Sequence, residues 1–90
     1  MVKIELAPDL EHCIETVAKK KYAELTQIML SKEGSDWEME EKLQLLRLFL
    51  EKADFRRLRA QSEKHLTEGR RVAYRIYLDK NELKVVLLFT

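Results

Sequence analysis

Cationic side chains are concentrated in residues 56–75 of this 90-residue chain, where they could bind phosphate groups. The guanidinium group of arginine is planar and stays charged, so clustered arginines suit the backbone of a nucleic acid. An aromatic ring among such cations can also stack on a base. The candidate nucleic-acid contacts are Arg56, Arg57, Arg59, Arg70, Arg71, Arg75, Tyr77 and Lys84.

Ser62 and His65 form the best nucleophile and base pair, since they are three residues apart and could touch on a helix. A serine site also needs an orienting acid and a sharply presented nucleophile, but only Glu68 is nearby and there is no glycine-rich turn. A small residue and a boundary histidine on an amphipathic helix explain the pair equally well. We therefore expect a protein without enzyme activity.

His12 and Cys13 are a second candidate pair, as metal ligands, and they are adjacent. A metal site would need further ligands at suitable spacing, and the chain has no second cysteine. The two glycines are isolated from each other, which argues against a phosphate-binding loop. We expect no metal, no cofactor and no small-molecule substrate.

Composition indicates one domain spanning residues 1–90, because 46% of the residues are hydrophobic and 37% are charged. No apolar run has transmembrane length, and acidic residues interrupt the N-terminal segment, which is unlike a signal peptide. A single cysteine fits a reducing, cytoplasmic location. Abundant Glu, Lys and Arg with little Gly, Pro or Asn is a thermophile-like composition.

The near-neutral net charge of +1 hides an uneven distribution. Residues 1–40 contain 5 Lys or Arg against 9 Asp or Glu, whereas residues 41–90 contain 12 against 7. An acidic half and a basic half can attract each other within a fold or between subunits, and a basic half can also contact nucleic acid.

Alternation of apolar residues in residues 70–90 predicts an antiparallel hairpin with its turn centred on Lys80 and Asn81, whose second strand is apolar on both faces. That turn opposes the apolar residues of one strand with those of the other, so both apolar rows reach the same side. The predicted pairs are Leu78 with Leu83, Ile76 with Val85, Tyr74 with Leu87, and Val72 with Phe89.

The second face of this hairpin is mixed, with Arg71, Arg75, Tyr77 and Lys84 beside apolar residues. Apolar side chains grouped on a face need a cover, which could come from the same chain or from a second subunit. The residues predicted to lie at a subunit interface are Ala73, Val86 and Leu88.

Apolar periodicity predicts one helix from Pro8 to about Lys32, capped by Gly34, and a second that begins with a Ser35–Glu38 capping box. The second helix either continues to residue 68 or breaks at residues 52–54, where Asp54 could cap a third; we favour the break. The same core is expected to contain Ile14, Leu25, Ile28, Leu46 and Leu50, with the hairpin packed on the first two helices.

The expected fold is α+β: two or three helices followed by a C-terminal antiparallel β-hairpin, with residues 2–6 as a possible third strand. Surplus apolar surface and opposite charge on the two halves predict a non-enzymatic interaction or assembly module that forms homo-oligomers. The alternative is a DNA- or RNA-binding protein, because the order helix, turn, basic helix and hairpin resembles a winged helix-turn-helix.

Overall fold

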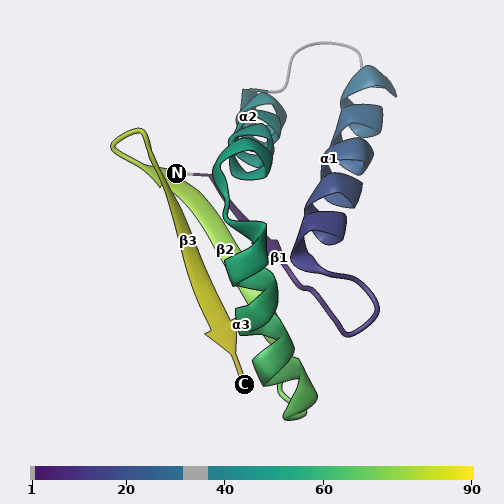
Figure 1. The fold of residues 1–90 in the computed structure, drawn as a ribbon. Helices are drawn as coiled ribbons and strands as arrows, with labels where there is room; N and C mark the ends of the chain where they lie inside the picture. The colour runs from purple at the N-terminus through teal and green to yellow at the C-terminus, as the bar shows by residue number, and fades with distance from the viewer. Residues whose placement is uncertain (1, 32–36) are drawn as a thin grey trace.

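The protein folds as α+β, as the sequence predicts, and its computed structural model describes residues 2–31 and 37–90. Three helices lie between a short N-terminal strand and a C-terminal hairpin (Figure 1). In chain order the elements are β1 (Lys3–Leu6), α1 (Ile14–Ser31), α2 (Trp37–Lys52), α3 (Phe55–Thr67), β2 (Val72–Asp79) and β3 (Glu82–Phe89).

The three strands form one antiparallel sheet in the order β1-β2-β3, so the N-terminal strand completes the hairpin's sheet as expected. Every predicted pair of the hairpin is observed, from Leu78 with Leu83 to Val72 with Phe89. Lys80 and Asn81 adopt positive φ of 51° and 64°, the backbone that a two-residue hairpin turn of matching twist requires. The predicted turn centre is therefore correct.

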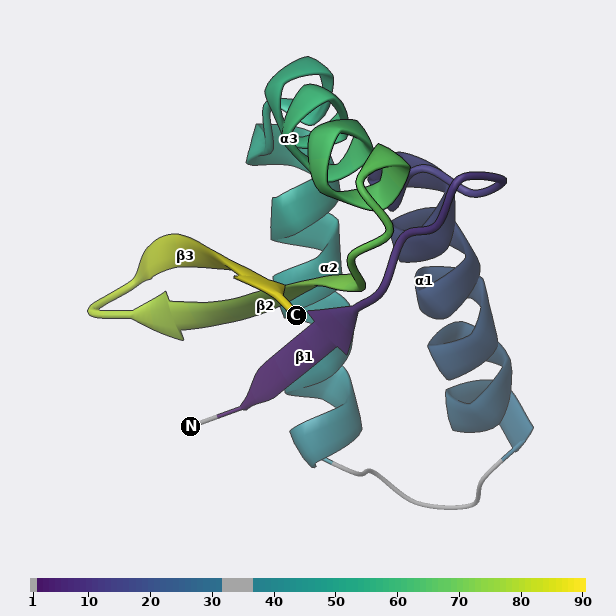
Figure 2. The ribbon, with the colours of Figure 1, turned by 90° about the horizontal axis from the view of Figure 1, so that it is seen from below.

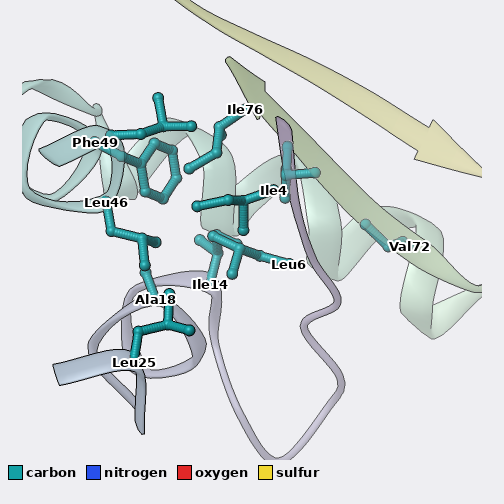
Figure 3. Packing of buried hydrophobic residues seen from close by; sticks show 11 residues of the cluster. Ile4, Leu6, Ile14, Ala18, Leu25, Leu46, Phe49, Val72 and Ile76 are labelled. Carbon is teal, nitrogen blue, oxygen red and sulfur yellow. The ribbon is translucent and has the colours of Figure 1, made fainter. Parts of the chain in front are cut away.

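All three helices pack on one side of this sheet and enclose the core (Figure 2). Phe49 and Leu46 of α2 point toward Ile76 of β2 and Ile4 of β1 (Figure 3). The hairpin's apolar row is contacted mainly by α2 and α3, whereas α1 packs against α2, α3 and β1. The expectation that the first two helices would cover the hairpin is thus correct for α2 and wrong for α1, because α3 packs on the hairpin in its place.

Helix α2 ends at Lys52 and α3 begins at Phe55, with Ala53 and Asp54 between them. Residues 36–68 therefore do not form one long helix. The Asp54 carboxylate accepts a hydrogen bond from the backbone N–H of Arg57 at 3.2 Å, which caps the new helix. At the other end Gly69 adopts φ 83°, a left-handed conformation that closes a helix readily. These two residues set the length of α3.

The predicted start of the first helix is wrong, because α1 begins at Ile14 rather than near Pro8. Asp9 accepts hydrogen bonds from the backbone N–H groups of Glu11 and His12, at 2.9 and 2.7 Å, and this local turn competes with helix. Leu10, which falls inside the predicted helix, lies instead in this loop and is 69% exposed.

The core prediction is correct for Ile14, Leu25 and Leu46, which are buried. Leu50 is only partly buried against the core. The assignment of Ile28 to the core is wrong, since its side chain is 42% exposed. The inward face of α1 runs instead from Leu25 to the half-buried Met29, four positions later. The predicted caps at Gly34 and Ser35 lie outside the described residues.

Replacing Asp54 with alanine should destabilise the protein by about 1 kcal/mol, since the first turn of α3 then loses its side-chain acceptor. Asp54→Asn is the matched control, because asparagine accepts the same hydrogen bond and should retain most of the stability. Urea unfolding followed by circular dichroism measures both variants. Equal stability of the alanine variant and the parent would show that the break at residues 53–54 is held by packing alone.

Candidate interaction surface

Strand β3 is the least covered part of the core layer, since none of its eight residues is buried. By contrast, Val72, Tyr74 and Ile76 of the neighbouring strand are buried beneath the helices. In both ribbon views the tip of the β2–β3 hairpin extends away from the helices (Figures 1 and 2). Strand β3 carries Val85 and Leu87 on one face and Val86 and Leu88 on the other, and the order β1-β2-β3 makes it an edge strand.

The face of the sheet turned away from the helices has no cover among residues 2–31 and 37–90 (Figure 2). The three residues predicted for a subunit interface lie on this open face, defined here as the side that carries Ala73, Val86 and Leu88. Val86 is 37% exposed, and Ala73 and Leu88 are half-buried by their neighbours. Their apolar surface is accessible in the single chain.

The free edge of β3 presents unpaired backbone groups in a known order. Arg71 and Thr90 exchange two backbone hydrogen bonds of 3.1 Å, so this pair is of the hydrogen-bonded kind. Such pairs alternate along antiparallel strands, which directs the backbone groups of the even residues 82–90 toward β2. The N–H and C=O groups of the intervening residues therefore point outward; these are Leu83, Val85, Leu87 and Phe89.

A groove of about 410 Å³ separates this strand from α3, and its floor is formed by Leu83, Val85 and Leu87. Tyr74 also lines the groove, and its hydroxyl donates a 2.7 Å hydrogen bond to the carbonyl of Leu58. Burial raises the pKa of the Tyr74 phenol above its ordinary value. The groove is thus a trough beside the sheet edge, apolar along β3 and polar on the side of α3, where Asp54 and Arg57 line it.

Neighbouring groups engage three cations of the open face, namely Arg75, Lys84 and Lys3. Arg75 donates to Glu5 of β1 through two nitrogens, at 2.7 and 3.0 Å. Lys84 contacts Glu82 at 3.2 Å on the same strand. The ammonium group of Lys3 lies 5.6 Å from the centre of the Tyr77 ring, a cation–π contact that competes with stacking of a base.

The arginines on and after α3 divide into paired and unpaired groups. Arg59 forms an ion pair with Glu63 at 3.5 Å, and Arg70 pairs with Glu68 while its guanidinium lies 5.8 Å from the centre of the Phe89 ring. No ion pair links the other three to any residue in the described ranges. These unpaired arginines are Arg56, Arg57 and Arg71.

The eight residues proposed from sequence to bind nucleic acid do not share one surface. Arg56 and Arg59 line a groove between α3 and the start of α1, and Arg57 lines the trough beside β3. Arg75 and Tyr77 lie on the open face, which is on the other side of the sheet from α3. The sequence cluster is therefore divided by the sheet itself.

Ser62 and His65 do not form a nucleophile and base pair in this structure. Ser62 is buried, and its hydroxyl donates to the carbonyl of Arg59 at 3.0 Å. His65 stacks on Phe89 with ring centres 4.1 Å apart. This ring contact holds the end of β3 against α3, and no local sequence pattern indicates it, because 24 positions separate the two rings.

His12 and Cys13 each bond locally. His12 Nδ1 lies 3.1 Å from Asp9 Oδ1, and the backbone N–H of His12 holds the pKa of the Asp9 carboxyl below its usual value. Cys13 Sγ lies 3.3 Å from the hydroxyl of Thr16, a hydrogen bond that lowers the pKa of the thiol. Within residues 2–31 and 37–90, no three His, Cys, Asp or Glu side chains lie close enough together to hold a metal ion.

The fold defines a small α+β protein whose three-stranded sheet is covered by helices on one face, and comparison places it in a family. The chain belongs to the protein family whose model matches residues 1–88. It is also 50% identical over 50 residues to an uncharacterised protein of Archaeoglobus fulgidus, a match that covers 53% of this chain and 59% of that relative. No solved structure matches the chain. Among the described helices, none combines the length and hydropathy needed to cross a membrane.

Tyr74→Phe should lower the free energy of unfolding by about 1 kcal/mol at neutral pH, because the hydrogen bond to Leu58 is lost. The raised pKa means that the folded state holds the phenol proton more tightly than the unfolded state does. This contribution is present below the unfolded pKa of about 10 and is lost as pH rises through the folded value.

The parent should therefore lose more stability than Tyr74→Phe when urea unfolding is repeated between neutral pH and pH values above about 10. Tyr77→Phe, on the open face, is the control and should follow the parent. Parallel alkaline losses in the parent and in Tyr74→Phe would contradict the assignment of a buried, proton-retaining phenol.

Proposed function

We infer that this protein is a non-enzymatic assembly module that works as a homo-oligomer. The observation that carries the proposal is strand β3, which has apolar residues on both faces, contains no fully buried residue and lies at the sheet edge. An exposed edge strand with hydrophobic side chains is a site at which a further chain pairs, unless charge, proline or a bulge blocks it. Only Lys84 supplies a charge within the strand after its first residue.

The open face supports the same proposal. Exposed apolar groups that are contiguous, rather than scattered, mark surfaces that contact another protein. Val86 and Leu88 are adjacent on this face, and Ala73 lies opposite Leu88 on the neighbouring strand. Arg75 and Lys84 beside them pair with Glu5 and Glu82, so the face presents apolar surface with a polar rim in which Arg71 has no ion-pair partner among the described residues.

Sedimentation velocity or light scattering over a range of concentrations tests the proposal, and a concentration-dependent dimer or larger oligomer is expected. The double variant Val86→Lys with Leu88→Lys should dissociate it. A charge placed at the centre of an interface costs about 2 kcal/mol, roughly thirtyfold in the dissociation constant. Leu10→Lys is the matched control, since this exposed leucine lies in the loop before α1. A monomer at the highest concentrations would exclude the assembly role.

Nucleic-acid binding is the second candidate, and two adjacent, unpaired arginines favour it. Arg56 and Arg57 are exposed at the start of α3 and have no ion-pair partner in the part of the chain that the structure describes. The break before α3 is also the feature that a helix-turn-helix arrangement needs. Fewer cations are available to bind phosphate than the sequence indicates, because four of them form ion pairs with carboxylates: Arg59, Arg70, Arg75 and Lys84.

Labelled duplex and single-stranded probes at low ionic strength test this candidate, which requires affinity that falls steeply with salt. Replacing Arg56 and Arg57 with glutamine should reduce the slope of log affinity against log salt by about 1.8, if each contacts one phosphate. Lys19→Gln with Lys20→Gln removes the same charge from α1 and should change the slope little. Absence of salt-dependent binding to both probes would exclude the candidate.

A further inference from the structure

We propose that the occupant of the β3 edge is the β3 strand of a second copy, which pairs antiparallel about a two-fold axis at Val86. This proposal rests on the assembly role inferred above and specifies its surface and register. The two three-stranded sheets would then join as one sheet of six strands, with the hairpins of both copies at its centre.

The outward backbone groups limit the registers that are available. Leu83, Val85 and Leu87 present their N–H and C=O groups at the free edge, so a second strand must place its own outward groups against them. Copies related by an axis perpendicular to the sheet keep their helix sides on the same face, because opposed side chains of an antiparallel pair share a face. The axis must therefore pass through a residue rather than between two.

An axis at Val86 uses the whole strand. Val85 then faces the partner's Leu87, and Leu83 faces the partner's Phe89, so that the apolar row meets an apolar row at every hydrogen-bonded position. An axis at Val85 would instead oppose Phe89 to Asn81 of the turn and shorten the ladder. An axis at Lys84 would oppose two like charges, which is destabilising.

Charge complementarity on the open face favours the same register and identifies a second copy as the partner. Arg71 lies beside Thr90 on this face and has no ion-pair partner in residues 2–31 and 37–90. With the axis at Val86, Thr90 stands opposite the partner's Glu82, and the partner's Asp79 continues the row. Each Arg71 thus faces the partner's Glu82 across one strand, with the partner's Asp79 one strand further along the row, and the two-fold repeats this arrangement at both ends.

Lys84, the one charge inside the strand, does not oppose this pairing. Its backbone groups point toward β2, and its side chain lies on the open face opposite the partner's Leu88. There its ammonium group stays in water, while its methylene stem covers the partner's leucine. The trough between β3 and α3, with Val85 and Leu87 on its floor, would be closed on its open side by the partner's apolar row.

The test is cysteine cross-linking of the 90-residue chain in a Cys13→Ser background, which removes the natural thiol. Opposed residues of a non-hydrogen-bonded pair lie about 4.5 Å apart between Cα atoms, within disulfide range. Val86→Cys should therefore form a reducible dimer under mild oxidation. Leu88→Cys, on the same face but opposite the partner's Lys84, should form about tenfold less, because disulfides tolerate only short Cα separations.

Light scattering on the Cys13→Ser parent tests the assembly role separately from the register of the β3 pairing. A dimer that does not cross-link through Val86→Cys would overturn the β3 register while leaving the assembly role in place. A monomer at all concentrations would overturn both. Equal cross-linking of the Val86→Cys and Leu88→Cys variants would also reject the register. Backbone amide exchange at Leu83, Val85 and Leu87 gives an independent readout, since protection of these three should rise with protein concentration.

Discussion

Every layer of this protein depends on the central position of β2. This strand is hydrogen-bonded along both edges, so its side chains alternate strictly between a covered side and an open side. Val72, Tyr74 and Ile76 form the floor on which α2 and α3 pack, and the same alternation leaves Ala73 and Arg75 outside. The three helices cover one side of the sheet, so the other side, with Ala73 and Arg75, remains accessible in the single chain.

The local features could be predicted from the sequence because they depend on neighbouring residues. Strand alternation has a period of two, and this fixes the hairpin register and the turn at Lys80 and Asn81. The break at Asp54 was likewise readable from a capping residue. The start of α1 was predicted wrongly because apolar periodicity gives no information on side-chain hydrogen bonds. Asp9 accepts hydrogen bonds from the backbone of Glu11 and His12 and forms a turn there.

The long-range features of the candidate surface could not be read from the chain. Arg75 pairs with Glu5, 70 positions away, only because β1 docks beside β2 in one register. The division of the arginines between two sides of the sheet depends in the same way on where α3 is placed. Composition located a basic segment correctly, but it does not reveal which guanidinium groups are already bound by carboxylates. The predicted interface residues Ala73, Val86 and Leu88 do share one accessible face.

The position of β1 has a consequence for how the chain folds. Lys3–Leu6 pairs with Tyr74–Tyr77, so the first strand can be added only when a loop of some seventy residues closes. The entropic cost of closure grows slowly with loop length, but contacts between distant segments form late and slow the search. The helices and the hairpin can form from local contacts, whereas Ile4 and Leu6 are buried only when this last closure occurs. Docking of β1 should therefore set the rate at which the core becomes sealed from water.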